Sequence, residues 1–258
     1  MIPTDDRGFA LGDGLFETVL AREGELVLWP AHLARLARGC AVLGLPAPDA
    51  GACREAARAA LDQAGLAAAR AAVRLNWSAG PGGRGLDRPE PMRPRLTAQA
   101  APAPRPAGPV AVATAAVRRN QGSPAARLKT LSYLDNVLAR REARAAGADE
   151  AVMLNAAGDL ACAAAGNLFW IAGGTLHTPA LECGVLDGVM RGALVDRARA
   201  AGWRVVETAA PRSALDAAEA VLLTNSLIGV RAVARLDGRD LPPHPAAAEL
   251  AALVSDLA

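Results

Sequence analysis

The 258-residue sequence holds a single lysine, Lys129, and a single tyrosine, Tyr133, although arginine occurs 27 times. Arginine can serve as a surface cation or an anion clamp, but its guanidinium group stays protonated and cannot become a nucleophilic amine. Lys129 is therefore a candidate for amine chemistry, such as a Schiff base with a carbonyl carbon. Composition alone leaves a second interpretation open, in which Lys129 is one surface lysine in an arginine-rich chain.

Aromatic residues are scarce, at 3% of the chain, which excludes a platform for stacking nucleic acid bases. Neither sign of charge dominates, because the chain has 28 basic and 26 acidic residues and a net charge of +2. A balance this even argues against general binding to nucleic acids or to membrane surfaces. We therefore expect neither nucleic acid nor membrane as a partner.

Cysteine pairs and histidine clusters are missing as well. No CxxC pair occurs and the three histidines are scattered, so we expect no metal site. The cysteines fit reduced thiols better than a disulfide frame; they are Cys40, Cys53, Cys162 and Cys183. Long apolar runs and a basic leader are also lacking. These absences predict a cytoplasmic protein without a membrane-spanning helix.

Hydrophobic residues make up 52% of the chain, which is ample for a buried core. Residues 1–100 show the mixed periodicity of an N-terminal α/β domain. The pattern predicts a hairpin over 15–29 with its turn at 22–25, helices over 31–42 and 50–64, and strands over 71–77 and 95–100.

Residues 101–109 carry four prolines and form the predicted interdomain linker. A C-terminal domain is expected over 110–258. Its predicted strands cover 110–117, 150–155, 167–172, 175–178, 203–208 and 220–224. Predicted helices cover 132–147 and 186–201, and the segment 242–258 ends in an alanine-rich helix.

Lys129 stands just ahead of the predicted helix 132–147. Ser132 and Asp135 have the spacing of a capping box, and the apolar face is predicted to consist of Leu134, Val137 and Leu138. Peptide dipoles at a helix start, together with cationic neighbours, would disfavour the ammonium form. We therefore expect a lowered pKa for Lys129.

Seven motifs follow one another along the chain in the order and spacing of a known family. They are FALGDGLFET (9–18), HLARL (32–36), LKT (128–130), AGNLF (165–169), TP (178–179), LDGVMR (186–191) and LTNSL (223–227). The chain resembles the class IV aminotransferases, which are fold type IV pyridoxal phosphate enzymes. That group includes branched-chain and D-amino-acid aminotransferases and aminodeoxychorismate lyase.

The resemblance implies an α/β (α+β) fold with two domains, a small N-terminal α/β sandwich and a larger C-terminal pseudo-barrel that binds the cofactor. It also implies a homodimer whose active site lies at the domain junction and near the partner chain. Pyridoxal 5'-phosphate is the implied cofactor, and an amine or amino acid is the implied kind of substrate.

Site residues can be carried over one by one. Lys129 would hold the cofactor as a Schiff base and would move the proton at the substrate carbon. Tyr133 resembles the tyrosine that hydrogen-bonds the cofactor's phenolic oxygen. Arg35 matches the arginine that clamps the phosphate, a role suited to a planar two-pronged donor. Read without the family, Tyr133 would be a core residue and Arg35 a solvated helix residue.

The remaining phosphate contacts lie around the start of the helix predicted over 186–201. Gly188 permits close backbone approach, and the first N–H groups of a helix form an anion site. The resemblance assigns the backbone N–H groups of Val189 and Met190 and the hydroxyl of Ser226 to the phosphate. Met190 replaces a commoner threonine, so one side-chain hydrogen bond is expected to be missing.

Cys162 is the largest departure from the family. Five residues before the asparagine of the AGNLF motif, the transaminases and much of the group carry a glutamate that keeps a proton on the pyridine nitrogen. A thiol is a weak donor and cannot stabilise a pyridinium as a carboxylate does. Transamination, which reprotonates the cofactor carbon, should suffer more than elimination, which expels a good leaving group as the carbanion forms.

Two loops favour the lyase further. SAGPGGRG (78–85) and TNSLIGV (224–230) resemble loops of the lyases. Arg84 in the first loop, and with weaker support Arg231, are candidate contacts for a substrate carboxylate. Leu227 and Ile228 are further candidate substrate contacts.

The sequence thus predicts an aminodeoxychorismate lyase that releases pyruvate and 4-aminobenzoate. An aminotransferase acting on D-amino or branched-chain amino acids shares every cofactor residue and is the alternative. The third hypothesis is a cofactor-binding homologue that has lost efficient catalysis.

Overall fold

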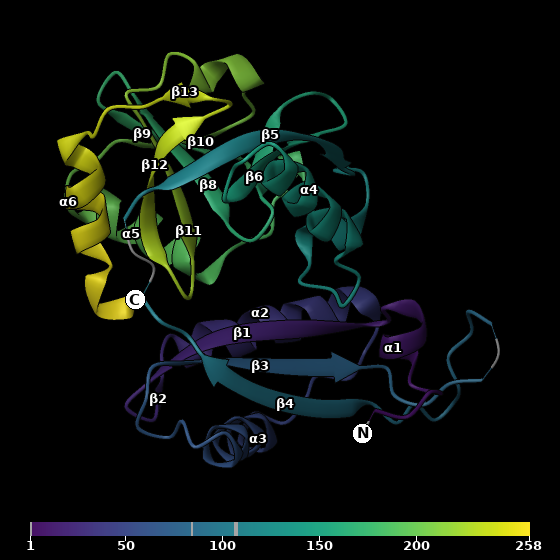
Figure 1. Cartoon of the computed structure of the whole chain (residues 1–258). Coiled ribbons are helices and arrows are strands. Elements are labelled where there is room, and N and C mark those ends of the chain that lie inside the picture. Colours follow the sequence, from purple (N-terminus) through teal and green to yellow (C-terminus); the bar gives the residue numbers. More distant parts are fainter. Residues whose placement is uncertain (1, 84, 106–107) are drawn as a thin grey trace. The chain divides into compact units, whose positions relative to one another are not determined.

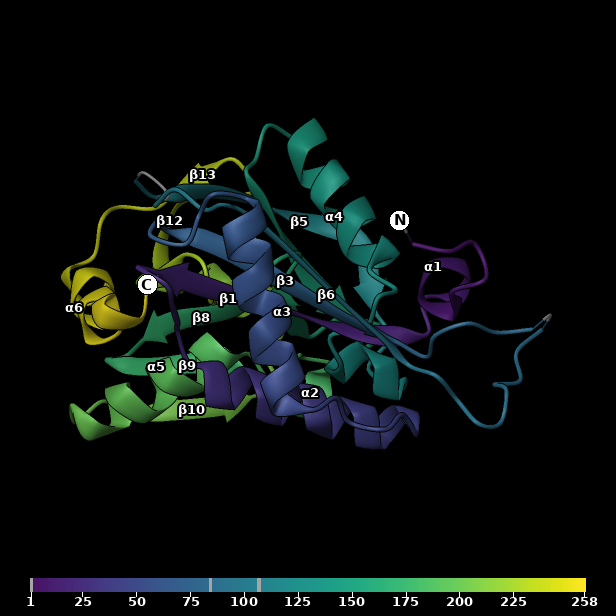
Figure 2. The same ribbon diagram turned by 90° about the horizontal axis from the view of Figure 1, so that it is seen from below.

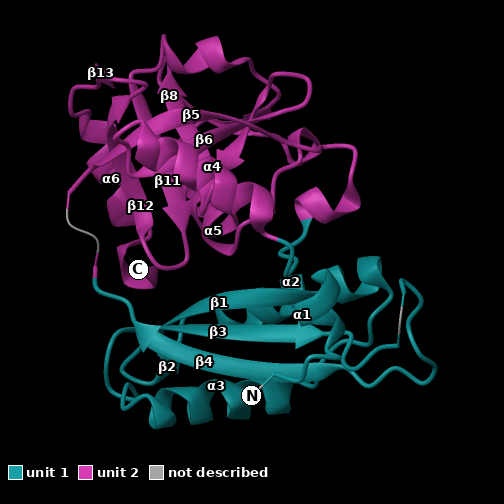
Figure 3. Ribbon diagram, turned by 45° about the vertical axis from the view of Figure 1, so that its right-hand side comes forward, with its two compact units in different colours: residues 1–104, 128–132 teal, residues 105–127, 133–258 magenta. Residues whose placement is uncertain are grey.

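A computed structural model describes residues 2–83, 85–105 and 108–258. By its contacts the chain divides into two compact units, which Figure 3 shows in different colours. The first unit consists of residues 1–104 and 128–132, and the second of residues 105–127 and 133–258. The change of unit after Pro104 falls inside the proline-rich segment, while the segment around Lys129 belongs to the first unit.

The first unit contains a sheet of strand order β2-β1-β3-β4, with every adjacent pair antiparallel. Its elements are α1 (Arg7–Leu11), β1 (Gly14–Arg22), β2 (Glu25–Leu26), α2 (Trp29–Leu43), α3 (Ala50–Gln63), β3 (Ala71–Ser78) and β4 (Arg95–Pro102). The hairpin predicted over 15–29 is confirmed, because Arg22 pairs with Glu25. Both predicted helices and both predicted strands are also present (Figure 1).

Helices α2 and α3 cover one face of this sheet (Figures 1 and 2). Alternate strand residues such as Val73 and Leu75 pack there against Trp29 of α2 and Leu61 of α3. Because successive side chains of a strand point to opposite faces, the residues between them lie on the other face. That other face of β3 carries Arg74.

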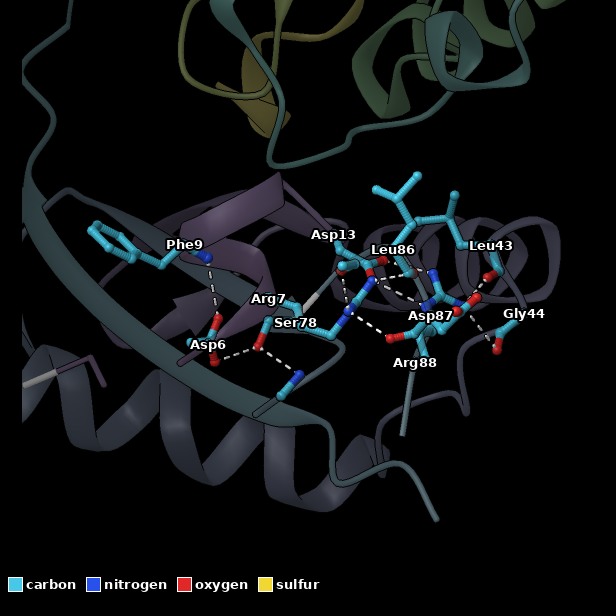
Figure 4. A network of polar contacts seen from close by, with 12 residues as sticks. Asp6, Arg7, Phe9, Asp13, Leu43, Gly44, Ser78, Leu86, Asp87 and Arg88 are labelled. Carbon is cyan, nitrogen blue, oxygen red and sulfur yellow. Dashed lines mark hydrogen bonds and ion pairs between the residues drawn. The ribbon is translucent and has the colours of Figure 1, made fainter. Parts of the chain in front are cut away.

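A polar network fixes the segment just before β1 (Figure 4). Arg7 Nε donates to Asp13 Oδ2 at 2.9 Å, and Arg88 Nη2 donates to Asp13 Oδ1 at 2.6 Å. Arg7 is buried and also donates to the carbonyl oxygen atoms of Leu86 and Asp87. Burial opposes ionisation of Asp13, but hydrogen bonds and charges from Arg88 and Arg7 outweigh it and lower the pKa. The network therefore ties the loop at 85–88 to the start of β1.

The segment 128–132 runs alongside β1. Lys129 O accepts a hydrogen bond from Phe16 N at 2.8 Å, and Leu131 N donates to Gly14 O at 2.9 Å. Leu15 and Thr130 form an antiparallel bridge between the two segments. Backbone hydrogen bonds on both sides of Lys129 therefore fix its position relative to β1.

The second unit contains a mixed sheet. In the described part of the chain its strands follow the order β10-β9-β8-β11-β12-β5-β6-β7, with β13 paired to β12. The strands are β5 (Val110–Arg119), β6 (Glu150–Asn155), β7 (Leu160–Ala163), β8 (Asn167–Ala172), β9 (Thr175–Pro179), β10 (Val205–Thr208), β11 (Ala220–Asn225), β12 (Gly229–Leu236) and β13 (Arg239–Asp240). The helices are α4 (Leu134–Ala145), α5 (Val189–Ala200) and α6 (Pro245–Leu253).

This sheet curls into a half-barrel (Figure 1), and an apolar core lies among its strands. Val112 of β5, Leu160 of β7, Trp170 of β8 and Leu223 of β11 belong to one buried cluster. Side chains of well-separated strands can meet in this way only if the sheet bends around them. The predicted α/β class and the C-terminal pseudo-barrel are thereby confirmed.

Helix α4 packs on the outside of β5 and β6 through alanines. Ala139 and Ala143 contact a cluster that includes Met153 and Cys162. The predicted apolar face was wrong, because Leu134, Val137 and Leu138 are 65%, 59% and 38% exposed. The inward positions are small because the helix lies close to the strands.

The predicted capping box was also wrong. Helix α4 begins at Leu134 with Tyr133 as its N-cap, and no side chain caps it. Residues 130 and 131 are paired with β1, so the chain is still extended at the position where the capping box required a helix start. The sequence patterns also missed α1, β7, β12 and β13, which are short or lack clear alternation of apolar residues.

A substitution at Gly14 tests how closely β1 packs against its neighbours. A Cβ atom at this position would lie 2.4 Å from Trp77 O and 2.8 Å from the side chain of Leu131. We expect Gly14→Ala to lower the free energy of unfolding by about 1–3 kcal/mol, since the backbone of β3 cannot move aside easily.

The matched control is Gly192→Ala in α5, where a Cβ meets nothing within 4 Å. Alanine favours a helix, so this variant should be more stable by about 0.5–1 kcal/mol. Denaturant unfolding followed by circular dichroism measures both variants. Equal effects of the two substitutions would contradict the close packing at Gly14.

Candidate active site

In the first unit, a buried carboxylate joins β1 to α2. Arg35 Nε donates to Glu17 Oε1 at 2.8 Å, and Arg35 Nη2 donates to Oε2 at 2.6 Å. His32 Nδ1 lies 2.7 Å from the same Oε2. His32 and Arg35 are one helical turn apart and therefore share a face of α2. The two-pronged contact sets the plane of the Arg35 guanidinium.

Protonation states in this cluster follow from its burial. Burial would raise the pKa of Glu17, but hydrogen bonds from Arg35 and His32 outweigh it and lower the value to about 2. Burial lowers the pKa of His32, although Glu17 acts in the opposite direction. An ionised carboxylate only accepts, so neutral His32 carries its proton on Nδ1 and donates it to Glu17.

Lys129 lies next to this cluster. Its Nζ atom is 4.3 Å from the ring centre of Phe16 on β1. Burial lowers the pKa of Lys129 to about 8; the charges of Arg35 and Arg74 act in the same direction and that of Glu17 acts against them. The lowered pKa agrees with the sequence-based expectation. The causes are burial and two arginines, while the helix expected at 132 starts only at Leu134.

In the second unit, the start of α5 is built for close approach. Gly188 is its N-cap, and no side chain caps the helix. A Cβ atom at Gly188 would lie 1.9 Å from Asn167 Oδ1, so only glycine fits there. Asn167 Nδ2 donates to Leu186 O at 2.9 Å and thereby holds the turn before the helix. The first N–H groups of α5, including those of Val189 and Met190, have no carbonyl partner within the helix.

Strand β11 ends close to Asn167. Thr224 pairs with Asn167 in the sheet, and its buried Oγ1 has no hydrogen-bond partner among the described residues. Asn225 Oδ1 accepts from the N–H groups of Leu227 and Ile228 at 2.9 and 3.0 Å. The loop that carries Ser226 is therefore fixed by Asn225, and a buried hydroxyl lies at its start.

Cys162 lies on β7 and is 5% exposed. Burial raises the pKa of its thiol, the charge of Arg119 opposes this effect and that of Glu150 adds to it. The thiol is therefore neutral at physiological pH. Glu150 does not replace the missing glutamate, because its Oε2 accepts from Arg140 at 2.6 Å and its Oε1 from Ala151 N.

Asn136 of α4 links this region to Arg119. Its Nδ2 donates to Ala164 O at 2.8 Å, and its Oδ1 accepts from Arg119 Nη1 at 3.1 Å. Sequence analysis did not single out Asn136, Arg119, Glu17 or His32. The HLARL motif offered a signal for one of them, because the spacing of His32 and Arg35 places both on one side of a helix.

The structure places the remaining predicted residues as follows. Tyr133 caps α4 and is partly buried. Arg231 lies on β12, where its Nε donates to Gly108 O at 2.9 Å. Arg84 lies outside the described residues. In the ranges that are described, no cluster of three or more histidine, cysteine or acidic residues is placed to hold a metal ion. No helix of the same ranges is long and apolar enough to cross a membrane.

The pKa of Lys129 is directly measurable because the chain has no other lysine. We expect an amine-reactive label to modify Lys129 of the cofactor-free protein with a half-maximal rate near pH 8, well below the usual 10.5. Glu17→Gln should lower this pKa further, since it removes the charge that favours the ammonium form. Arg35→Gln should raise it.

Mass spectrometry of the labelled peptide gives the rate at each pH, with the terminal amine as internal reference. Thermal unfolding of each variant controls for loss of structure. Shifts of the same sign in both variants, or a wild-type value near 10.5, would contradict the charge arrangement around Lys129.

Comparison with known proteins places these features in a family. The model of the family described as amino-transferase class IV matches residues 14–236. A bifunctional aminodeoxychorismate lyase / D-amino acid transaminase from Mycobacterium tuberculosis is 30% identical over 280 residues, which cover 99% of this chain and 94% of the relative.

Two solved structures have the same fold. The 4-amino-4-deoxychorismate lyase from Pseudomonas aeruginosa is 32% identical with a TM-score of 0.87, covering 99% of this chain and 95% of its own. A branched-chain aminotransferase from Thermoproteus uzoniensis is 26% identical with a TM-score of 0.90, covering 98% and 87%. The chain therefore belongs to the class IV aminotransferase family, whose members use pyridoxal phosphate.

Proposed function

We propose that this protein is a 4-amino-4-deoxychorismate lyase, which eliminates pyruvate from its substrate and leaves 4-aminobenzoate. The product belongs to folate biosynthesis, and we place the protein in that pathway in the cytoplasm. The observation that carries the proposal is the buried, neutral thiol of Cys162 at the position where transaminases of the family hold a glutamate.

The first unit offers a fitting partner for an aldehyde cofactor. With a pKa of about 8, an appreciable fraction of Lys129 is the unprotonated amine at neutral pH, which is the form that attacks an aldehyde. Arg35 is already oriented by Glu17 and presents a planar donor suited to phosphate. We assign Lys129 to the aldehyde carbon and Arg35 to the phosphate.

The second unit offers further donors for a phosphate. The uncapped start of α5 at Gly188 favours an anion, because its N–H groups and the helix dipole act together. The buried Thr224 Oγ1 is an orphaned polar group that a phosphate oxygen or a bridging water would satisfy. We assign the N–H groups of Val189 and Met190 and the hydroxyl of Ser226 to the phosphate, and Tyr133 to the phenolic oxygen.

Pyridoxal phosphate, when bound, supplies a conjugated ring that draws electrons from the carbon next to the bound amine. Lys129 Nζ then removes the proton from the substrate carbon that carries the amine. The bond between the ring and the enolpyruvyl oxygen breaks, and a proton delivered to the enolpyruvate methylene carbon gives pyruvate. The new aromatic ring provides part of the driving force, so this reaction depends less on a protonated pyridine nitrogen.

Cys162 determines how well that nitrogen keeps a proton. A neutral thiol donates only weakly, and Glu150 is engaged by Arg140 and a backbone amide. Reactions that return the electron pair to the cofactor carbon should therefore be slow. An aminotransferase acting on D-amino or branched-chain amino acids is the second candidate, because relatives of both kinds share the fold. A homologue with weakened catalysis is the third.

The deciding experiment offers the purified holoenzyme aminodeoxychorismate and, separately, pairs of amino acid and 2-oxo acid. We expect pyruvate and 4-aminobenzoate from the first and little exchange from the second. Cys162→Glu should raise the transamination rate severalfold, because a carboxylate stabilises the protonated ring. Exchange of keto acids without release of pyruvate would establish the aminotransferase.

Two controls keep the result clear. Reduction with borohydride should attach the cofactor covalently to Lys129. Protein that stays colourless after addition of pyridoxal phosphate would rule out both the lyase and the aminotransferase. Cys183→Ala removes another buried thiol of the same cluster and should leave the ratio of the two activities unchanged. Arg84 stays a predicted carboxylate contact, and an unchanged Michaelis constant in Arg84→Ala would refute it.

We also propose a homodimer. Leu134, Val137 and Leu138 form an exposed apolar strip on α4 of the kind that a second copy of the chain buries. We expect twice the monomer mass in sedimentation, and a shift toward the monomer in Val137→Glu. Arg58→Gln, at an exposed position of α3, is the control. A dimer unaffected by Val137→Glu would place the interface elsewhere.

A further inference from the structure

We infer that Arg191, in the first turn of α5, is a positioning residue for the cofactor phosphate, because it fastens that turn to β9 and β10. The inference rests on the proposed function in taking the start of α5 as a phosphate site. It gives Arg191 a task that runs through Glu207 and Pro179 and needs no contact between Arg191 and the phosphate.

Arg191 joins α5 to the last residues of two neighbouring strands. Its side chain is buried, and Nη2 donates to Glu207 Oε2 at 2.6 Å and to Pro179 O at 3.3 Å. Pro179 ends β9, and Glu207 on β10 lies beside Thr178 of β9 in a parallel pairing. Nη1 also lies 3.8 Å from Asp187 Oδ1, just before the helix. The guanidinium therefore ties the first turn of α5 to the sheet.

A second anchor holds the chain just ahead of this turn. Asn167 of β8 donates from Nδ2 to Leu186 O at 2.9 Å. Gly188 is enclosed by both anchors, since a Cβ atom there would lie 1.9 Å from Asn167 Oδ1 and 3.2 Å from Arg191 Cβ. The two N–H groups that we assign to the phosphate belong to the two residues between Gly188 and Arg191. They are thus held to the sheet from both sides.

Stability alone does not account for a buried arginine at this place. The helix dipole disfavours a cation in the first turn. Arg191 Nε is buried and has no hydrogen-bond partner within the described ranges, and such an unsatisfied donor lowers stability. An apolar residue of similar volume is often as stable as a buried ion pair. Departures of this kind are typical of functional sites, so we attribute Arg191 to the orientation of the turn.

The charges around Arg191 balance. Glu207 accepts from Arg191 and, through Oε1, from Arg199 Nη2 at 3.2 Å. The hydrogen bond from Arg191 outweighs burial and holds the pKa of Glu207 below its usual value, so Glu207 is ionised at neutral pH. Two arginines thus accompany two carboxylates, those of Glu207 and Asp187. Arg191 therefore affects an anion at the start of α5 chiefly through the direction of the N–H groups.

Two aldehydes test this role, pyridoxal 5'-phosphate and pyridoxal, which lacks the phosphate. Both react with Lys129 of the cofactor-free full chain, and absorbance gives each dissociation constant. Wild-type protein should bind the phosphorylated aldehyde more tightly. Arg191→Met should weaken that binding about tenfold or more and leave the binding of pyridoxal within about twofold, because misdirected N–H groups affect only the phosphate.

Three further variants make the comparison specific. Arg191→Lys retains the charge and a hydrogen bond to Glu207 and should recover part of the preference for the phosphate. Glu207→Gln keeps the shape of the partner and should weaken binding of the phosphorylated aldehyde by a smaller factor, which keeps the role testable if Arg191→Met does not fold. Arg197→Gln breaks the ion pair with Asp256 in the last turn of the same helix and should change neither constant.

The phosphorus-31 resonance of the holoenzyme is a second readout, which a general loss of stability does not move. In the wild type it should differ from that of the free cofactor, and in Arg191→Lys it should move toward the free value. Equal loss of affinity for both aldehydes would overturn the inference, because Arg191 would then support only the fold. Unchanged discrimination between the aldehydes in Arg191→Met would overturn it as well.

Failure of this inference differs from failure of the proposed function. A protein that exchanges keto acids without releasing pyruvate, yet loses its preference for the phosphate in Arg191→Met, is not the lyase but uses Arg191 as inferred. A lyase whose Arg191→Met variant keeps the preference does not use it so. A wild-type chain that binds the two aldehydes equally would contradict both the inference and the assignment of Val189 and Met190 to the phosphate.

Discussion

The pairing of residues 128–132 with β1 is the constraint on which the chemistry of the first unit depends. Two backbone hydrogen bonds, from Phe16 N to Lys129 O and from Leu131 N to Gly14 O, hold Lys129 beside this strand. The same strand supplies the ring next to the amine through Phe16 and the carboxylate of the cluster through Glu17. The position of Lys129, an apolar neighbour and one of the charges that act on it thus come from one strand.

Burial and the neighbouring charges together set the pKa of Lys129. The pair of Glu17 and Arg35 is close to neutral as a whole, so it orients a donor for an anion without adding a full positive charge. Arg74 on the neighbouring strand β3 donates through Nε to Asn76, and its charge acts with burial to lower the pKa of Lys129. The result is an amine that loses its proton at about pH 8.

Secondary structure that depends on neighbouring residues could be predicted from the sequence. Features that depend on contacts between distant parts of the chain could not. The hairpin of β1 and β2 and the helices α2, α3 and α5 follow from periodicity and turn residues, and the motifs were found by resemblance to a known family. The start of α4 was misplaced because the pairing of Thr130 with Leu15, which is distant in sequence, keeps that segment extended. The exposed Leu134 shows the same limit, because alanines rather than large apolar residues fit close to β5 and β6. Within the site, Lys129 stood out by rarity, whereas the contacts of Arg35 with Glu17 could be found only from the fold.

The scarcity of lysine also bears on how the protein acquires its cofactor. An aldehyde condenses with any accessible amine, and most proteins offer it many lysines that capture it without use. This chain offers one side-chain amine, already placed next to β1, and its many other cations are guanidinium groups that do not condense. Once the terminal amine is blocked, the ratio of bound aldehyde to protein therefore reports occupancy of a single position, so that partial loading can be read from absorbance.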